Sequence, residues 1–321
     1  MDNYSHSKVQ NITVDYNTQG QRLDNYLIKT LKGVPKSHIY RIIRSGQIRI
    51  NSKRVKAHTR LMQNDLLRIP PIVHKNPQDF VVNESLADVL NQSIIYQDDY
   101  LIAINKPAGL AVHSGSGVDI GVIEIMRQLH GKDLELVHRI DKDTSGVLLI
   151  AVNRESATKM HTLLREQEIT KMYKLCVWNK WPAEIKTVSV PLNKIMTASG
   201  EAKMQVDKKD GDTAITKFRL EESYPCASLL TAELVTGKTH QIRLHAAHHH
   251  CPIISDKKYG DYAINKYLAK NEINKLMLHA WQVKFIHPFT EKPTTITAAV
   301  SREFKQQLKV IRKLELETGY T

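Results

Sequence analysis

Short apolar runs alternate with amphipathic ones along most of this 321-residue chain. Short runs of branched aliphatic residues between polar turns are typical of buried strands, whereas apolar positions three and four apart indicate helices. Both kinds occur after residue 90, which predicts an α+β fold: a large, mixed, mostly antiparallel sheet with helices on its flanks. The strand-like runs are 101–104, 147–152, 173–177, 229–234 and 296–300, and the helix-like ones are 161–167 and 304–316.

The first seventy residues carry a separate pattern. Two apolar stripes at helical spacing predict two small helices, and Gly46 is well placed to end the second. Residues 48–50 then alternate as a strand, 51–53 turn, Val55 begins the return and 66–69 close a short sheet. Two helices on a short curled sheet resemble the alpha-L (S-four type) RNA-binding domain. The first stripe contains Leu23, Tyr26, Leu27 and Leu31, and the second Ile39, Ile42 and Ile43.

Periodicity is lost after Pro70, where Pro70, Pro71 and Pro77 interrupt a polar stretch. Such a stretch indicates a linker, although apolar residues near its end suggest a short helix. We therefore expect an RNA-binding domain over residues 1–70, a linker over 71–90 and a larger domain over 91–321. The chain is long enough for two domains of this size.

Charge supports a polyanionic partner. The formal net charge is +13, and the window from Arg22 to Arg68 holds twelve Lys or Arg against Asp24 and Asp65, so it carries +10 of that total. A basic surface of this density normally follows phosphates, and a solvated face kept for solubility is the alternative. The side chains expected to bind RNA are Arg22, Lys36, Arg41, Arg44, Arg49, Lys53 and Arg54.

Several classes of protein are disfavoured. No apolar run reaches the ~18–20 residues of a membrane span, and the polar start does not resemble a signal peptide, so we expect a cytoplasmic protein without a membrane partner. Three cysteines without a Cys-x-x-Cys pair fit a reduced compartment. The histidines at 245 and 248–250, next to Cys251, suggest zinc, but no second ligand pair lies at standard spacing. We expect no metal.

The segment from Leu136 to Gly146 joins two strand-like runs with a compact polar loop, Val-His-Arg-Ile-Asp-Lys-Asp-Thr-Ser. Three generic interpretations remain open from these residues. A calcium loop would need Glu at its twelfth position, where Val152 stands. A magnesium-dependent phosphatase would use Asp141 and Asp143 after an unbroken strand, which His138 and Arg139 interrupt. An ordinary turn is the third.

A second segment, Thr236-Gly237-Lys238-Thr239-His240-Gln241-Ile242-Arg243-Leu244-His245, changes that balance. Together the two segments resemble the RluA family of pseudouridine synthases. The family's catalytic His-Arg-Leu-Asp-x-x-Thr-Ser-Gly is matched with Ile140 in the Leu place, and its Thr-Gly-Arg-x-His-Gln-Ile/Leu-Arg-x-His with Lys238 in the first Arg place. Lys171-Met172-Tyr173, the upstream 105–113 and the downstream 278–280 fit in the expected order.

The resemblance implies a pseudouridine synthase fold for residues 91–321 and a reaction that needs no cofactor. It assigns the catalytic carboxylate to Asp141, leaving open whether this group attacks the sugar carbon or removes a sugar proton. Arg243 would keep the buried carboxylate ionised, an ordinary strand-surface arginine being the alternative. Tyr173 would stack on the displaced base and help to remove the C5 proton.

The resemblance also implies a set of substrate contacts. Arg139 would fill the gap left by the flipped base, His138 would orient the loop or touch a phosphate, and Leu278 would form an apolar wall. Lys106 and Lys171 are plausible phosphate contacts. His240 of the second segment completes the set.

Within the family, the segments around 31–42, 115–124 and 192–194 are similar to members that act on 23S ribosomal RNA. This similarity implies 23S rRNA as the partner, free or in a large-subunit assembly intermediate. We expect a monomer without an obligatory protein partner. The alternative function is a catalytically inactive RNA-binding factor in ribosome assembly, against which the intact Asp141, Tyr173 and Arg243 argue.

Overall fold

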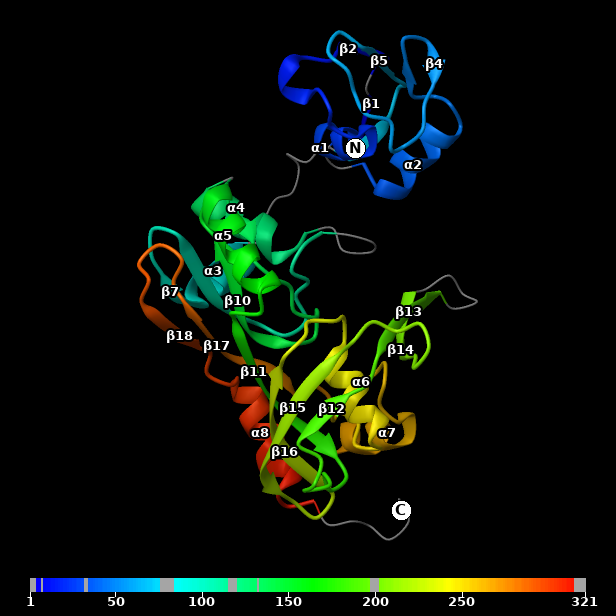
Figure 1. Cartoon of the computed structure of the whole chain (residues 1–321). Coiled ribbons are helices and arrows are strands. Elements are labelled where there is room, and N and C mark those ends of the chain that lie inside the picture. Colours follow the sequence, from blue (N-terminus) through cyan, green and yellow to red (C-terminus); the bar gives the residue numbers. More distant parts are fainter. Residues whose placement is uncertain are drawn as a thin grey trace. The chain divides into compact units, whose positions relative to one another are not determined.

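The computed structural model describes residues 4–6, 8–31, 34–75, 84–114, 120–131, 133–196 and 202–314. The chain divides into two compact units, residues 1–82 and residues 83–321. Each unit has its own hydrophobic core. Figure 1 shows the two units as ribbons.

The N-terminal unit contains two helices and a small antiparallel sheet. Helices α1 (Leu23–Thr30) and α2 (Lys36–Arg44) bury Leu23, Leu27 and Ile39 against the sheet residues Ile50 and Leu67. The strand order is β2-β5-β3-β4, with bounds Gln10–Thr13, Leu66–Ile69, Arg49–Ile50 and Lys53–Arg54. A short 3₁₀ helix (Tyr16–Thr18) precedes α1, and β1 (Tyr4–His6) pairs with β6 (Val73–Lys75).

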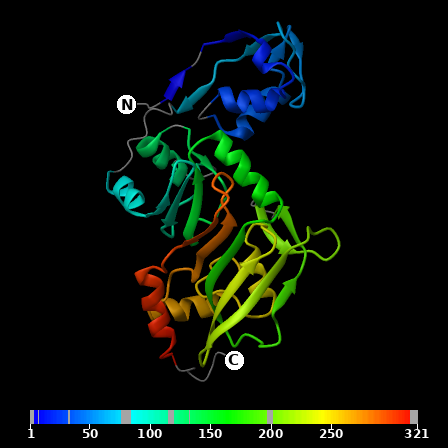
Figure 2. The ribbon, with the colours of Figure 1, turned by 60° about the vertical axis from the view of Figure 1, so that its left-hand side comes forward.

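The larger unit is built on one twisted sheet of ten strands (Figures 1 and 2). Its main order is β12-β15-β16-β11-β17-β10-β8-β7, with β18 paired to β17 and β9 to β10. Among the described strands only β10 and β17 run parallel. The bounds are β7 Ile94–Gln97, β8 Leu101–Lys106, β9 Glu135–Leu136, β10 Ser145–Ala151, β11 Thr170–Trp178, β12 Thr187–Ser189, β15 Ile215–Ser223, β16 Ala227–Leu234, β17 Leu278–Ile286 and β18 Pro293–Thr297.

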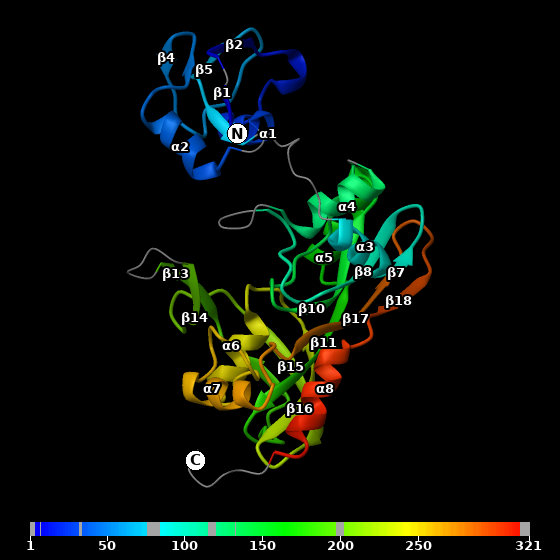
Figure 3. The same ribbon diagram turned by 180° about the vertical axis from the view of Figure 1, so that it is seen from behind.

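Helices and one hairpin surround this sheet. The hairpin β13 (Leu192–Met196) and β14 (Ala202–Val206) forms a separate two-stranded sheet, and α6 and α7 lie close together near it (Figures 1 and 3). Helix α8 packs beside the start of β17, where the ring of Phe304 lies 6.5 Å from that of His279. The helices are α3 Glu84–Gln92, α4 Val122–His130, α5 Arg154–Arg165, α6 Gln241–His248, α7 Tyr262–Lys270 and α8 Arg302–Ile311.

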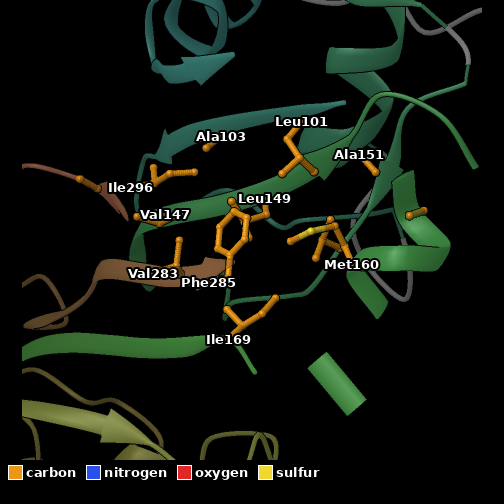
Figure 4. Close-up of a cluster of buried hydrophobic side chains, with 13 residues drawn as sticks. Leu101, Ala103, Val147, Leu149, Ala151, Met160, Ile169, Val283, Phe285 and Ile296 are labelled. Carbon is orange, nitrogen blue, oxygen red and sulfur yellow. The ribbon is translucent and has the colours of Figure 1, made fainter. Parts of the chain in front are cut away.

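One core cluster holds the centre of the large sheet. Leu149 of β10, Phe285 of β17 and Ile296 of β18 pack with Met160 of α5 (Figure 4). Strand β10 is buried along its whole length, as expected for an uninterrupted aliphatic run. Such a strand is held rigidly, so the loop that enters it starts from a fixed point.

The α+β architecture and its mostly antiparallel mixed sheet confirm the predicted fold class, but details differ. Strand β6 lies within residues 71–90, where the sequence predicted a linker, whereas helix α3 lies where a short helix was suggested and extends to Gln92. The return strand β4 starts at Lys53 rather than Val55, because Asn51 and Ser52 alone make the turn with positive φ. Helices α4, α6 and α7 were not predicted; the segment 115–119 and the residues 32–33 lie outside the described residues.

Candidate active site

Asp141 lies in the loop between β9 and β10, in the larger unit. The loop is fixed at its end because Ser145 and Gly146 pair with His279 and Ala280 of the parallel strand β17. The Ser145 hydroxyl also lies 2.8 Å from Nδ1 of His279, a buried contact. The side chain of Asp141 is 24% exposed, so it is reachable from solvent but partly enclosed.

Arg243 reaches Asp141 from α6, a helix 102 residues later in the chain. Its Nη1 donates to Oδ2 of Asp141 at 3.0 Å, and its side chain is only 8% exposed. The alternative considered above, an arginine on the surface of a strand, is wrong because Arg243 is buried on a helix. An ion pair between a buried guanidinium and a partly exposed carboxylate holds both groups in one orientation.

A second carboxylate, Asp256, holds the other edge of Arg243. It accepts hydrogen bonds from Nε and Nη2 of the guanidinium, both at 2.8 Å, and its side chain is completely buried. Burial alone would raise the pKa of Asp256, but the hydrogen bonds and charge of Arg243 outweigh it, so the pKa lies below its usual range. Burial likewise opposes the charge of Arg243, yet the pKa of Arg243 is raised by Asp256 and Asp141.

His240 faces the other oxygen of Asp141. Its Nε2 lies 3.7 Å from Oδ1, and its Nδ1 lies 2.7 Å from the hydroxyl of Tyr259. The backbone of His240 is left-handed, with φ 55°, at the residue before α6. Burial lowers the pKa of His240, although the charge of Asp141 opposes that shift.

Asp141 lines a cavity of about 1500 Å³. Pockets for small ligands commonly measure roughly 300–1,000 Å³, so this one has room for more than a single base. Tyr173 and Leu278 line it from the neighbouring strands β11 and β17, and both side chains are buried. The pairing of these two strands changes register from Met172 to Tyr173. Irregularities of this kind are common next to active sites, where they change the direction of a side chain.

Tyr173 is kept protonated by its surroundings. Burial raises its pKa above the ordinary value for tyrosine, and the charge of Asp141 adds to the rise. A buried phenol beside a carboxylate offers an aromatic face and a hydrogen-bond donor rather than a base.

Comparison with known proteins finds two matching families and several similar chains. Residues 100–248 match the family described as RNA pseudouridylate synthase, and residues 21–67 match the S4 domain. A relative from Haemophilus ducreyi named "Ribosomal large subunit pseudouridine synthase C" is 42% identical over 310 residues, which are 95% of this chain and 97% of the relative. One of the same name from Buchnera aphidicola is 42% identical over 313 residues, which are 96% and 99% of the two chains.

The chain belongs to the RNA pseudouridylate synthase family. This membership confirms the resemblance inferred from the two motifs. Among solved structures, Human RNA Pseudouridylate Synthase Domain Containing 4 is similar with a TM-score of 0.58 and 26% identity, covering 72% of this chain and 97% of that one. Human RNA Pseudouridylate Synthase Domain Containing 1, at a TM-score of 0.54 and 20% identity, shares the fold.

Around the pseudouridylate synthase pocket, the remaining predicted contacts differ in accessibility. Arg139 is exposed, and Lys171 is half-buried with a pKa lowered by burial; both line the cavity. His138 also lines it, but its Nε2 accepts a hydrogen bond from the backbone of Leu149, and burial lowers the pKa of His138 to about 4. His138 is therefore bonded to the backbone of β10 within the same unit.

Lys106 lies differently from the phosphate contact that the sequence suggested. It is fully buried, and its ammonium donates to the carbonyl oxygens of Pro107, Leu110 and Lys142 at 2.8, 2.8 and 3.1 Å. Burial lowers the pKa of Lys106 to about 7. Since three acceptors use its three hydrogens, Lys106 ties the loop after β8 to the loop that carries Asp141.

All seven side chains predicted to bind RNA in the N-terminal unit are exposed. Some also have partners within the unit: Arg22 pairs with Asp24 at 2.7 Å, and Arg49 donates to the carbonyls of Gly46 and Ser52. Arg41 contacts the ring of His38. These contacts orient the guanidinium groups without removing them from solvent.

The histidines near Cys251 do not assemble a metal site. His245 is fully buried between Thr216 and the carbonyl of Val190, and Cys251 is buried. Across the described ranges, no group of three His, Cys, Asp or Glu side chains could hold a metal ion. None of the described helices is long and apolar enough to cross a bilayer.

Asp256 and Tyr259 are members of the site that the sequence motifs did not predict. Both lie in the turn that precedes α7. The signal in the sequence was weak: an acidic and an aromatic residue three apart in an otherwise basic segment, Asp256-Lys257-Lys258-Tyr259.

Proposed function

We propose that this protein isomerises specific uridines of 23S ribosomal RNA to pseudouridine, with Asp141 as the catalytic carboxylate. One observation carries the assignment: Asp141 projects into a large cavity while Arg243, locked by Asp256, holds one of its oxygens. The names of the relatives, which refer to the large ribosomal subunit, support the choice of substrate.

The target uridine must leave its stack to reach this carboxylate. Extrusion costs a few kcal/mol. Contacts to the flipped base and to the flanking nucleotides offset this cost. In this proposal Arg139 occupies the gap in the RNA and Lys171 meets a phosphate; both side chains line the cavity, Arg139 exposed and Lys171 half-buried. Arginine suits the first role because its planar guanidinium stacks on neighbouring bases.

Within the pocket, Asp141 acts on the sugar of the bound nucleotide. Whether it attacks the anomeric carbon or removes a neighbouring proton, the carboxylate must be ionised and held still, which Arg243 does through Oδ2. Oδ1 is left to face the substrate. The protonated Tyr173 supplies a stacking surface and a donor to the uracil, and Leu278 an apolar wall.

The N-terminal unit would hold the RNA through its exposed lysines and arginines, so that the catalytic unit meets a tethered substrate. We place the enzyme in the cytoplasm, where ribosomal RNA is processed, and as a monomer. Sedimentation of the purified chain alone and with rRNA tests the second statement, since a dimer would sediment at twice the mass.

The decisive test compares Asp141→Asn with wild type in cells that lack the endogenous protein, reading pseudouridine in 23S rRNA. The substitution keeps the size of the side chain and removes its charge, so we expect the modification to disappear. Asp143→Asn is the matched control, because Asp143 is an exposed aspartate of the same loop and should leave the modification intact. Unchanged pseudouridine content in Asp141→Asn would exclude catalysis by this site.

A further inference from the structure

We propose that Asp256 and Tyr259 are positioning residues of the reaction, each fixing one of the two side chains that face the oxygens of Asp141. Asp256 fixes Arg243 on the side of Oδ2, and Tyr259 fixes His240 on the side of Oδ1. The inference rests on the proposed function and extends it to residues that do not touch the reacting atoms.

The argument for Asp256 starts from the geometry of the guanidinium. Two parallel hydrogen bonds from Nε and Nη2 set the plane of Arg243, and only Nη1 is then directed to Asp141. Asp256 is itself held, because its Oδ1 accepts the backbone N–H groups of Lys258 and Tyr259 at 2.9 and 3.0 Å. Its carbonyl oxygen accepts from Asn265 at 2.9 Å. Asp256 is therefore held in place, and it holds the guanidinium of Arg243 in one orientation.

Charge gives Asp256 a second role. One guanidinium lies between two carboxylates, so the three groups together keep one negative charge. The buried Asp256 takes the hydrogen bonds of Nε and Nη2, and Arg243 donates to Asp141 through Nη1, to Oδ2. One oxygen of Asp141 thus stays uncommitted for chemistry. Without Asp256, the guanidinium could rotate and bind both oxygens of Asp141.

Tyr259 acts on the same carboxylate through His240. Its hydroxyl lies 2.7 Å from Nδ1 of His240, and its ring lies 5.1 Å from the guanidinium carbon of Arg243. These contacts fix the imidazole whose Nε2 is 3.7 Å from Oδ1 of Asp141. An imidazole at that distance limits the movement of Oδ1 without forming a short hydrogen bond to it.

The test measures single-turnover and steady-state kinetics of the full chain on a 23S rRNA substrate. For Asp256→Asn we expect kcat to fall about 100-fold with KM changed by less than about twofold, because a misplaced reacting group affects the chemical step. For Tyr259→Phe, which loses one hydrogen bond, we expect kcat to fall about tenfold. Asp261→Asn is the control: it lies in the same turn and caps α7 rather than holding Arg243, so its kinetics should match wild type.

A double-mutant cycle separates positioning from general support of the fold. If Asp256 acts through Arg243, adding Asp256→Asn to Arg243→Gln should cause no further loss of rate. Losses that multiply would overturn the proposal, as would wild-type kcat in folded Asp256→Asn and Tyr259→Phe. Should Asp256→Asn not fold, Tyr259→Phe alone decides, since it removes only a hydroxyl. If the wild type itself formed no pseudouridine, the proposed function would fail instead.

Discussion

Gly146 illustrates how one residue next to the site depends on close packing. Its φ is +111°, and a Cβ added there would lie 2.1 Å from the carbonyl oxygen of Ala280. The contact arises because β10 and β17 run side by side at this point. The motif therefore requires glycine for a steric reason, in addition to the backbone conformation.

We predict that Gly146→Ala destabilises the larger unit far more than Gly109→Ala. Gly109 also has a left-handed φ, +89°, but nothing lies within 4 Å of the position that its added methyl group would take. The conformational cost alone should be about 1–2 kcal/mol in both variants. The clash with β17 should add at least about 2 kcal/mol at Gly146. Urea unfolding measures the difference; equal losses would show that strand contact is irrelevant there.

His245 provides a prediction for pH. Burial lowers its pKa to about 4, against 6.5 in the unfolded chain. Between these values the unfolded state binds more protons, so the free energy of unfolding falls as the pH decreases from about 6.5 to about 4. His245 should contribute no more than about 3 kcal/mol to this decrease in the free energy of unfolding, given its pKa near 4.

The variant His245→Gln removes that titration while keeping hydrogen-bonding groups near Thr216 and Val190. Its stability should depend less steeply on pH than that of wild type in the window from about pH 4 to 6.5. Urea unfolding at several pH values gives both slopes. Parallel slopes would mean that other groups account for the acid sensitivity.

At the scale of elements, sequence periodicity predicted the buried strands and the first two helices well. Strands β8, β10, β11 and β16 coincide with aliphatic runs, because strands buried on both faces need no alternation. Helix α6 was not predicted, for a related reason. Six of its eight residues are buried, so it has no polar face to reveal helical spacing.

Other elements depend on contacts that a local pattern does not contain. Strand β6 continues beyond the prolines because β1 pairs with it, although the local composition resembles a linker. Lys106 has a similar explanation: the family resemblance suggested a phosphate contact, whereas folding buries its side chain and brings the carbonyl of Lys142 to its ammonium. Tertiary pairing decided both cases.

At the scale of the whole molecule, the site could be predicted only in part. The two motifs identified Asp141 and Arg243, which the fold then brings into contact across 102 residues. Asp256 and Tyr259 could not be found in this way, because their function depends on where the turn before α7 meets α6. Residues that hold other residues carry a weak local signal, whereas residues that match a family motif carry a strong one.

The basic N-terminal unit leads to the last prediction. Alanine at Lys36, Arg41 and Arg44 together, all exposed on α2, should weaken binding to 23S rRNA and flatten its dependence on salt. Each lost phosphate contact should change the slope of log affinity against log salt by about 0.7–0.9. Filter binding at several salt concentrations measures it, and kcat at saturating RNA should change little because the pocket is intact.

The matched control removes the same charge from the other unit, by alanine at Lys305, Lys309 and Lys313, which are exposed on or just after α8. If α2 contacts phosphates directly, only the α2 variant should show a shallower slope of log affinity against log salt. If the slope becomes equally shallow in both variants, RNA affinity depends on net charge alone. Since the two proteins have the same formal charge, any difference between them must come from where the lysines and arginines lie, and thus from the S4 domain itself.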